Sequence, residues 1–435
     1  MDREFDVIVF GASGFTGQYV VEEMAISMND ESLYKRNNLR WAIAGRDRKK
    51  LNQVLKNVAK VTGLEWYRQV RIIEADTNNY ESLVEMCKKT RLMISVVGPY
   101  RFFGEPLVKA CVEATTDYVD VSGEPQFLEG MQLKYYEEAK KKGVYIVSAA
   151  GWDSVPADVG TTWTKQQFPG DLNGVEIVVS TKSPDGAKMN FGTWHSAIYG
   201  YACAHELKPL RQKLYRDILK PPASRSNHPL KRRPFLSYVD EVKGYCLPFP
   251  GSDRTVVKRS EVLKYNEKKE RPVYCETYFR VGSIFSGLTI LLVASVFGIL
   301  AKFSAGRSLL RAFPGFFSFG VVSKDGVPRS SLEKCSFSHT IIGYGWDEKV
   351  DDVDRQHDTA PSKKIITRIS GPDPGYIATA TFLVHSGMTL LFDRQQLPAP
   401  GVITPGAAFR DTFLIDRLTK RNIKFEVVQK YIRSP

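Results

Sequence analysis

The sequence predicts an α/β protein in which a doubly wound parallel sheet is followed by a second, mixed α/β domain. Two observations lead to this fold class. Short apolar runs rich in β-branched residues alternate with helix-compatible stretches as far as residue 150, which is typical of parallel strands joined by helical crossovers. The chain is also 435 residues long, and a single core stops growing at roughly 250–300 residues. We therefore expect two domains.

A glycine-rich turn follows the first predicted strand. The strand spans Phe5–Phe10, the turn reads GASGFTG over residues 11–17, and a helix-compatible stretch continues to about Met28. Glycines permit a tight bend close to a pyrophosphate, and the helix amino terminus presents free N–H groups and a positive dipole end. The pattern predicts a Rossmann-type dinucleotide site, although a glycine-rich turn that binds no ligand would have the same sequence pattern. Its expected binding residues are Gly11, Ser13, Gly14, Phe15, Thr16 and Gly17.

The residues after the second predicted strand bear on the choice of cofactor. This strand, Leu39–Ala44, ends in Gly45, Arg46, Asp47 and Arg48. A carboxylate at this place holds the ribose hydroxyls of NAD, whereas an arginine accommodates the 2′-phosphate of NADP. Because Arg46 comes first and further basic residues follow, we expect NADP, with NAD left open by Asp47. The same residues would also suit the solvated first turn of a helix.

The remaining elements of the first 150 residues continue the alternation. Ligands of parallel sheets collect at the carboxyl ends of the strands. We therefore expect Asp76 on the adenine side and Gly98, Pro99 and Tyr100 on the nicotinamide side, although each also fits a simple turn. The expected strands are 70–74, 92–97, 118–121 and 144–148, and the expected helices are 80–89, 105–114 and 125–141.

Five motifs follow one another along the chain: GASGFTG at 11–17, AGR at 44–46, VGPY at 97–100, DVSGE at 120–124 and GWDSVPAD at 151–158. In this order they resemble the saccharopine dehydrogenase-like oxidoreductases over nearly the whole chain. The resemblance implies a Rossmann domain, a second α/β domain and NAD(P) binding, and it points to relatives that act as trans-acting enoyl reductases in lipid and glycolipid assembly. Saccharopine reductases typically carry a Gly-x-Asp-Pro-Gly type of sequence where this chain has GWDSVP, which argues against saccharopine as the substrate.

One candidate for proton transfer is the pair Tyr136 and Lys140, which has the Tyr-x-x-x-Lys spacing, with Ser122 fourteen residues before the tyrosine. Short-chain dehydrogenases use such a trio, because the lysine lowers the phenol pKa and the serine orients the carbonyl. In a lysine-rich chain with 20 tyrosines the spacing also arises by chance, and the charged stretch around Tyr136 favours an exposed helix face.

Acidic residues in later loops are the other catalytic candidates. Glu124 lies in the loop 122–125, and Asp153 and Asp158 lie in the segment 151–158, where a substrate would approach a nicotinamide. They could orient a cationic or hydroxylated substrate or shuttle a proton, and helix capping is an equally good account. Hydride transfer mainly requires alignment of donor and acceptor, so no obvious catalytic residue is required.

Composition and spacing argue against several function classes. The six cysteines form no CxxC pair and the six histidines show no ligand spacing, so we expect reduced cysteines and no metal site. The sequence contains no P-loop, nucleophile elbow or HExxH motif. The net charge of +13 favours phosphate-rich ligands or anionic membranes, and without a nucleic-acid-binding motif it does not favour nucleic acid. The acidic, strand-like residues 1–10 argue against a cleaved signal peptide.

Beyond the dinucleotide-binding domain, 1–150, we expect a substrate domain at 151–384 and a carboxyl-terminal region, 385–435, that returns to the first domain. The basic segment 208–233 has Asp217 as its only acid, which favours a mobile surface loop that meets phospholipid head groups or an anionic substrate, or one that is merely solvated. Expected elements are the strands 175–180, 365–369, 376–383 and 423–428, a strand or turn at 192–194, the helices 385–394 and 412–420, and a constrained loop at 401–407.

The apolar segment 281–320 is a candidate for membrane association. Val281–Ala301 contains no charged residue and approaches the ~20 residues needed to span a bilayer core. Arg307 and Arg311 separate it from an aromatic run at 313–319, which suits a monotopic anchor or hairpin in one leaflet, with burial in the fold as the alternative. The surface of a lipid droplet or of the endoplasmic reticulum would accept such an anchor, and a mitochondrial membrane stays open.

Together these patterns predict a membrane-associated, NADP-preferring oxidoreductase that acts on a carbonyl, imine or enoyl group of a small or lipid-like substrate. The alternative from another class is a non-catalytic dinucleotide-binding scaffold or sensor at a membrane or lipid-droplet surface. A third interpretation is an extended short-chain dehydrogenase that uses Tyr136 and Lys140. Self-association into a homo-oligomer stays open.

Overall fold

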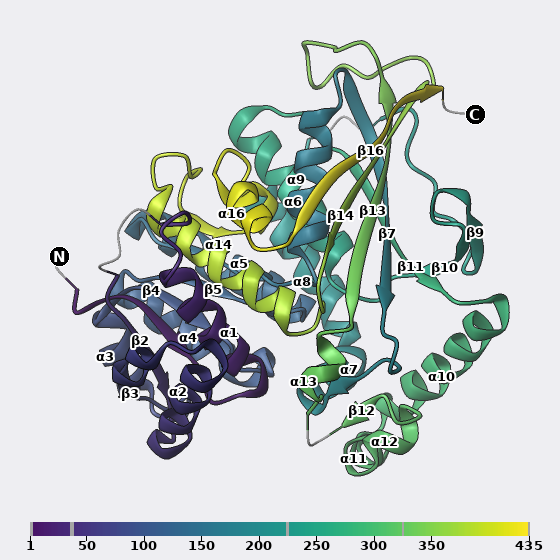
Figure 1. Cartoon of the computed structure of the whole chain (residues 1–435). Helices are drawn as coiled ribbons and strands as arrows, with labels where there is room; N and C mark the ends of the chain where they lie inside the picture. The colour runs from purple at the N-terminus through teal and green to yellow at the C-terminus, as the bar shows by residue number, and fades with distance from the viewer. Residues whose placement is uncertain (1–2, 35–38, 223–225, 324–325, 434–435) are drawn as a thin grey trace. The chain divides into compact units, whose positions relative to one another are not determined.

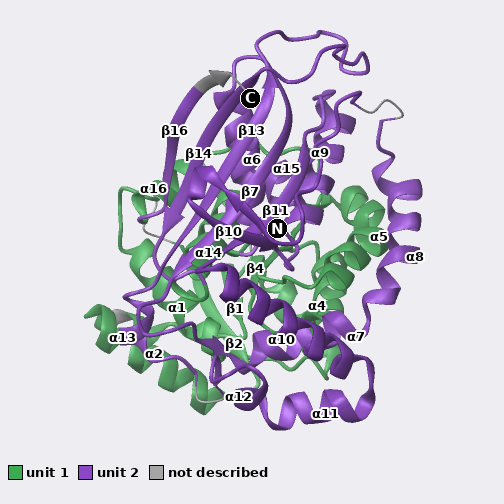
Figure 2. Ribbon diagram, turned by 90° about the vertical axis from the view of Figure 1, so that its right-hand side faces the viewer, with its two compact units in different colours: residues 1–152, 375–403, 411–421 green, residues 153–374, 404–410, 422–435 purple. Residues whose placement is uncertain are grey.

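The structure, a computed structural model, describes residues 3–34, 39–222, 226–323 and 326–433. The chain folds into two compact units (Figure 2). Whereas the sequence suggests domains of 1–150, 151–384 and 385–435, the chain re-enters unit 1 at residue 375 and then alternates between the units. Unit 1 comprises residues 1–152, 375–403 and 411–421, and unit 2 comprises 153–374, 404–410 and 422–435.

The described part of unit 1 contains a seven-stranded parallel sheet in the order β15-β6-β5-β4-β1-β2-β3. Ile8 of β1, for example, pairs with Ala42 of β2 on one side and with Met93 of β4 on the other. The order 3-2-1-4-5-6 is that of a doubly wound dinucleotide-binding sheet, which confirms the predicted fold class. The strands are β1 Phe5–Phe10, β2 Trp41–Gly45, β3 Arg71–Glu74, β4 Thr90–Ser95, β5 Asp117–Asp120, β6 Tyr145–Val147 and β15 Gly401–Ile403.

Helices connect these strands, and their ends follow local sequence rules. α2 begins after Asp47, whose carboxylate accepts a hydrogen bond from the Lys50 N–H, and it ends at Gly63, whose φ of +72° glycine adopts without strain. Leu51 and Leu55, one turn apart, belong to the buried face of the helix. The helices are α1 Phe15–Met28, α2 Arg48–Thr62, α3 Tyr80–Lys88, α4 Tyr100–Ala114, α5 Pro125–Lys142 and α16 Leu414–Lys420.

A further helix of unit 1, α14, comes from a distant part of the chain. It spans Ile377–Phe392 and packs on β4 and β5. A Cβ on Gly387 would lie 3.0 Å from the Leu92 side chain and 3.2 Å from that of Val119, so glycine lets the helix approach the sheet closely. The strand predicted at 376–383 is therefore wrong. Because residues 378–390 are all buried, their apolar run lacks the periodicity that separates a helix from a strand.

Unit 2 contains a mixed sheet in the order β16-β14-β13-β7-β11-β10-β9, in which β7 and β11 are parallel and the other pairs antiparallel. α6 packs on β13 and β14, and α9, beside α6, packs on β11. This confirms the predicted second α/β domain. The elements are β7 Asp171–Lys182, β9 Ser237–Val239, β10 Gly244–Pro248, β11 Tyr274–Val281, β13 Ser336–Trp346, β14 Lys363–Gly371, β16 Lys424–Arg433, α6 Val155–Gln167, α9 Asp253–Lys268 and α15 Pro405–Ala408.

Two segments of unit 2 differ from their sequence-based prediction. Residues 192–194, expected in a strand or turn, lie in the helix α7, Phe191–Ala202. The basic segment 208–233 begins inside α8, Leu207–Leu214, which a short π-helix extends to Leu219. Its leucines 214 and 219 are fully buried, so packing holds this first part, which is not a free loop. Residues 223–225 of the segment lie outside the described residues.

Three consecutive helices follow β11 in unit 2 (Figure 1). Ala301 of α10 and Leu310 of α11 form a small buried cluster with Ile198 of α7. In the described part of the chain α10 is the one helix long and apolar enough to cross a membrane, and only 11% of its most apolar window is buried. The three helices are α10 Ile284–Lys302, α11 Ser304–Ala312 and α12 Pro314–Phe317.

Candidate functional site

The turn between β1 and α1 in unit 1 has the backbone geometry of a phosphate-binding loop. Gly11 has a φ of +88°, and a Cβ at this position would lie 2.6 Å from the Val97 side chain. A Cβ on Gly17 would collide with the carbonyl oxygen of Gly11. Both positions therefore require glycine, which keeps the turn tight and its backbone open to a close ligand.

The amino terminus of α1 is suited to bind an anion. Ser13 and Gly14 precede the helix, and Phe15 and Thr16 are its first two residues. The N-cap residue, Gly14, makes no side-chain hydrogen bond to the first turn. Its first N–H groups therefore point outward with the positive end of the helix dipole, the arrangement that holds a pyrophosphate. The Phe15 ring meets that of Tyr376 edge-on, with 4.7 Å between the ring centroids.

Of the charged residues that follow β2, some pair with other residues of the described ranges and Arg46 does not. Asp47 is the residue whose carboxylate would suit the ribose hydroxyls of NAD. In the structure it caps α2, since its carboxylate accepts a hydrogen bond from the Lys50 N–H at 3.1 Å. Arg48 pairs with Glu74 at 3.2 Å. Arg46 is exposed, and in the described ranges its side chain has no ion-pair partner. Its guanidinium, the first cation after β2, is therefore available for a 2′-phosphate.

Two aspartates at the carboxyl ends of strands fix the neighbouring backbone. The Asp76 carboxylate accepts the N–H of Asn78 at 2.9 Å and shapes the turn before α3. The Asp120 carboxylate accepts the N–H groups of Ser122 at 2.9 Å and Ala149 at 3.1 Å. Burial is the main reason that the pKa of Asp120 rises to about 6. Both residues shape the loops at the ligand-binding edge of the sheet.

Glu124 acts as the cap of α4, the helix that begins at Tyr100. Its two carboxylate oxygens accept the N–H groups of Tyr100 at 2.9 Å and Arg101 at 3.1 Å. The Tyr100 hydroxyl donates to the Ser95 carbonyl oxygen at 3.0 Å, and burial raises the pKa of this phenol well above its ordinary value. Gly98, Pro99 and Tyr100 thus connect β4 to α4 at the carboxyl end of the strand.

Tyr136 and Lys140 lie on α5, where the lysine ammonium is 5.9 Å from the centre of the tyrosine ring. Lys140 is exposed, and the Tyr136 ring packs beside the backbone of Gly401. At about 1.5 Å of rise per residue, Tyr136 is roughly 16 Å along α5 from its first residue, Pro125. Ser122 precedes that first residue, so α5 carries the Tyr136 ring away from the Ser122 hydroxyl.

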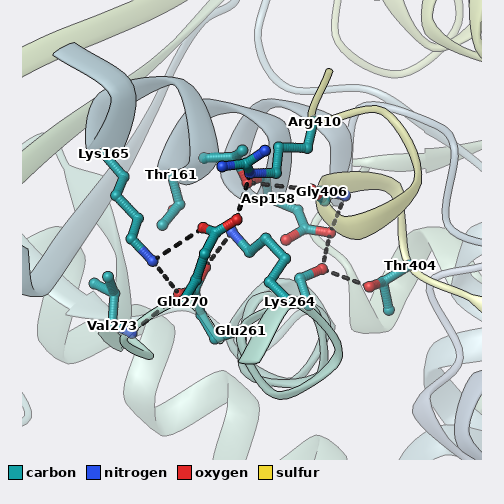
Figure 3. A network of polar contacts seen from close by, with 12 residues as sticks. Asp158, Thr161, Lys165, Glu261, Lys264, Glu270, Val273, Thr404, Gly406 and Arg410 are labelled. Atoms are coloured by element: carbon teal, nitrogen blue, oxygen red, sulfur yellow. Dashed lines mark hydrogen bonds and ion pairs between the residues drawn. The ribbon is translucent and has the colours of Figure 1, made fainter. Parts of the chain in front are cut away.

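Asp158 belongs to a buried polar network of unit 2 (Figure 3). Its Oδ2 atom accepts hydrogen bonds from the Ser260 hydroxyl and the Gly406 N–H, both at 2.6 Å. Burial raises the pKa of Asp158 to about 6. The network ties α6 to α9 and to residues 404–410, which points to a structural role. Its ion pairs are Lys165–Glu261, Lys165–Glu270, Lys264–Glu261 and Arg410–Glu270.

Asp153 lies in the loop that leads into α6 and is half-buried. Its Oδ2 atom accepts a hydrogen bond from the Ser252 hydroxyl at 3.2 Å. Burial, followed by the neighbouring Asp253 carboxyl, raises the pKa of Asp153 to about 7. A carboxyl group that titrates near neutrality can both give and take a proton, which is the property required of a general acid or base.

Tyr376, Asp253 and His339 belong to none of the sequence motifs. Tyr376 stands beside the glycine turn only because α14 folds back onto the sheet of unit 1. Asp253 follows Gly251 and Ser252 at the start of α9, a pattern typical of a helix cap, and His339 is one residue of a β-strand. No local motif marks any of them. In the described ranges no group of three or more His, Cys, Asp or Glu residues could hold a metal ion.

Known proteins with a dinucleotide-binding domain of this kind are similar to the chain over nearly its whole length. A family model described as "Saccharopine dehydrogenase NADP binding domain" matches residues 7–147. The chain is 44% identical to "Saccharopine dehydrogenase-like oxidoreductase" of Homo sapiens over 98% of each chain, and 37% identical to "Lipid droplet localized protein" of Caenorhabditis elegans over 98% of this chain and 99% of that one. Apo saccharopine dehydrogenase (L-Glu forming) of Saccharomyces cerevisiae has a similar fold, with a TM-score of 0.51, 14% identity, and coverage of 98% of this chain and 100% of that one.

The sheet order, the glycine turn and the matched domain define an NADP-binding oxidoreductase of the Rossmann type. The chain belongs to the saccharopine dehydrogenase-like oxidoreductase family. The expected fold class, family and cofactor are thereby confirmed.

Proposed function

We propose that this protein uses NADPH to reduce, or NADP to oxidise, a carbonyl, imine or enoyl group of a small or lipid-like substrate. The observation that carries the proposal is the glycine turn, whose two crowded positions admit only glycine and whose helix terminus is left uncapped. Gly11, Ser13, Gly14, Phe15, Thr16 and Gly17 would hold the pyrophosphate, and Arg46 the 2′-phosphate. The bound cofactor would supply or accept the hydride.

The remaining cofactor contacts are proposed from their place at the carboxyl ends of the strands. Asp76 follows β3 and would lie along the adenosine half, and Gly98, Pro99 and Tyr100 follow β4 and would lie along the nicotinamide half. Glu124 positions this second segment through its hydrogen bonds to the first turn of α4. The lipid-like nature of the substrate is supported by the name of the Caenorhabditis elegans relative.

Cofactor binding is tested by fluorescence titration of the full chain with NADPH and NADH. Arg46→Ala should weaken NADPH binding by about tenfold or more, since a charge-assisted contact to phosphate contributes roughly 1.5–3 kcal/mol, and should leave NADH binding unchanged. Arg48→Ala is the matched control, because Arg48 is already paired with Glu74. Equal effects of the two substitutions would contradict the assignment of Arg46.

Turnover is tested with NADPH and three acceptor classes: a trans-2-enoyl thioester, a long-chain aldehyde and a cyclic imine. We expect NADPH oxidation with one class and a product that is heavier by two hydrogens. Tight NADPH binding without turnover of any class would instead favour a dinucleotide-binding scaffold or sensor.

We further propose that the protein acts at a membrane or lipid-droplet surface through α10, α11 and α12. α10 is packed on one side only. Gly287 and Ala301 lie on its buried side, whereas Phe285, Leu292 and Ile299 are exposed by 77%, 67% and 59% at a helical spacing of seven residues. Further exposed apolar side chains along α10 to α12 and their ends are Ile284, Leu288, Ile290, Val296, Phe303, Leu309, Phe313, Phe316 and Phe319.

The charges of this region suit an anionic lipid surface. From Thr277 to Ser323 the sequence has no acidic residue, and its cations are Arg280, Lys302, Arg307 and Arg311. Since α10 packs against α7 and α11, it would lie in one leaflet with its exposed stripe among the acyl chains. The name of the Caenorhabditis elegans relative supports a lipid-droplet surface.

Vesicle flotation of the full chain tests this second proposal. We expect binding to phosphatidylserine-containing vesicles that Leu292→Asp reduces by at least tenfold. Val61→Asp is the matched control, since Val61 is 50% exposed on α2 and should not contact lipid. If both variants float like the wild type, or if the wild type does not float, the lipid-surface proposal fails.

A further inference from the structure

Unit 1 has a cavity at the edge of its sheet where the parallel strands begin. Its volume is about 380 Å³, within the roughly 300–1,000 Å³ that is usual for small-molecule sites. Arg3 precedes β1, Arg91 is the second residue of β4, and Asp117 is the first residue of β5. Arg394 reaches the cavity from the chain just after α14. Thr115, Gly143, Leu390 and Leu391 complete the lining.

This arginine-lined cavity is distinct from the proposed cofactor site. Arg3 comes before β1 and Gly11 comes after it, and a strand of six residues is roughly 20 Å long. Ligands of doubly wound sheets usually bind at the opposite edge, where the strands end. Binding at the edge where the strands begin therefore depends on what the lining of the cavity offers.

The lining carries an excess of positive charge. Three guanidinium groups and one carboxylate, that of Asp117, give it a net charge of +2. One carboxylate oxygen of Asp117 accepts the Tyr145 N–H at 2.9 Å, and the other accepts a hydrogen bond from Arg394. Burial raises the pKa of Asp117, and the guanidinium groups of Arg394 and Arg91 oppose that rise. The carboxylate is thus occupied, and it orients Arg394.

Two of the arginines are fixed by contacts within unit 1. Arg3 donates to carbonyl oxygens at the ends of α3 and α4, of which that of Ala114 is 2.6 Å away. Arg394 donates to the Gly143 carbonyl oxygen at 2.9 Å, and its guanidinium lies 4.4 Å from the centre of the Tyr145 ring. Side chains that are already ordered lose little conformational entropy when a ligand binds, which favours affinity.

Arg91 is the least constrained of the three arginines. Its side chain is 53% exposed, and its Nη1 atom lies 3.3 Å from the Asp6 carboxylate, which also pairs with Arg40. Among the described residues its Nε and Nη2 atoms make no hydrogen bond. These N–H groups form one side of the planar guanidinium fork, whose geometry matches two oxygens of a phosphate group.

A purely structural role does not account for all three arginines. Cations stabilise the carboxyl ends of helices, which explains Arg3, and the ion pair with Asp117 explains Arg394. Neither effect explains why Arg91 adds a third guanidinium group to the same cavity, since like charges repel one another. An anion in the cavity would balance the net charge of +2 and accept the N–H groups that Arg91 leaves unused.

We propose that this cavity binds a phosphate group, as free phosphate or as a small phosphate monoester, through Arg3, Arg91 and Arg394. A phosphate monoester carries roughly −1.5 to −2 charges at pH 7, which matches the excess charge of the lining. Leu391 is half-buried in the wall and would contact the carbon atoms of an ester. The inference goes beyond the proposed function, because it concerns a separate edge of the sheet and needs no turnover.

Isothermal titration calorimetry of the full chain with inorganic phosphate and with glycerol 3-phosphate tests the proposal. Saturating NADPH is present throughout to occupy the glycine turn. We expect saturable binding, which Arg91→Ala should weaken by about tenfold or more, because a charge-assisted contact is lost. Arg71→Ala is the matched control and should leave the affinity unchanged. Arg71 begins β3 at the same edge of the sheet, is 74% exposed and pairs with Glu4, but does not line the cavity.

The two phosphate compounds distinguish the source of the phosphate group. Tighter binding of glycerol 3-phosphate would identify an ester as the ligand, and equal or weaker binding would identify free phosphate. Arg91→Ala should keep the wild-type Tm, because Asp6 retains Arg40 as a partner. As a second variant, Arg91→Glu reverses the charge and should abolish detectable binding.

The proposal is overturned if the wild type binds neither compound, or if Arg91→Ala and Arg91→Glu bind like the wild type. An equal loss in Arg71→Ala would also overturn it, because the effect would then come from the overall charge of the protein. Failure of NADPH to bind would contradict the proposed function alone, since the loss in the Arg91 variants would still report on this cavity.

Discussion

Glu23 offers the most direct test of the energetics of unit 1. This glutamate of α1 is 6% exposed, and Arg421 binds it through two hydrogen bonds of 2.9 and 3.0 Å. His385 Nε2 lies 3.1 Å from the same carboxylate, and the Tyr34 hydroxyl lies 2.6 Å from His385 Nδ1. Burial lowers the pKa of His385, so the neutral ring donates through Nε2 and accepts from Tyr34. The carboxylate thus joins α1 to α14 and to the residue after α16.

The contribution of Glu23 to stability follows from its pKa. Burial alone would raise it, but His385 and Arg421 lower the pKa from 4.5 to about 2. At about 1.4 kcal/mol per pKa unit, this shift corresponds to about 3 kcal/mol of stability. Because the folded-state pKa is depressed, the contribution is complete above pH 4.5 and is lost as the pH falls through about 2. Glu23→Gln should therefore cost about 3 kcal/mol at neutral pH.

Differential scanning calorimetry provides the assay. For a unit of roughly 150–250 residues, 3 kcal/mol corresponds to a decrease in Tm of about 6–12 °C. Glu137→Gln, at an exposed position of α5, is the control and should change Tm little. In Glu23→Gln/Arg421→Gln the second substitution should cost less than it does alone, because the ion pair is already broken. Full additivity, or a Glu23→Gln variant as stable as the wild type, would refute the reasoning.

Three further predictions follow from positions already described. Gly17→Ala should abolish detectable NADPH binding in the titration, because its Cβ would collide with the carbonyl oxygen of Gly11; binding at wild-type affinity would contradict the placement of the phosphates. Asp158→Asn should flatten the fall in stability between about pH 4 and pH 6, since the folded-state pKa of Asp158 is raised to about 6 and its stabilising protonated form is lost over that range; the measurement is Tm against pH. Gly387→Leu should lower Tm by several degrees, because it would force α14 away from β4 and β5, and an unchanged Tm would disprove that close packing.

The elements of unit 1 that could be predicted from the sequence are those whose determinants are local. Asp47 and Gly63 bound α2 by capping rules, and the glycines at 11, 14 and 17 mark their turn by spacing alone. The mis-assigned α14 shows the limit. Its apolar run is buried on all sides, so the amphipathic periodicity that identifies a helix is missing, and only packing on β4 and β5 decides between helix and strand.

In the candidate site, too, local sequence patterns predict some residues, whereas others are brought in by distant parts of the chain. Asp153 was among the candidates because it follows a predicted strand, whereas Asp253 and His339 come from α9 and β13. Nothing in their neighbours along the chain indicates that they meet in the core of unit 2. Their altered protonation arises from burial, which is a property of the folded chain and cannot be read from residue spacing.

The placement of β15 has a consequence for how the chain matures on the ribosome. Residues 401–403 form the edge strand beside β6, and α14 shields β4 and β5, yet both emerge only after most of unit 2 has been synthesised. Until then the nascent amino-terminal sheet exposes an unpaired strand edge and an apolar face, both of which promote aggregation. A chain that stops short of residue 375 would keep these surfaces permanently, so premature termination should yield a chaperone client, not a smaller working enzyme.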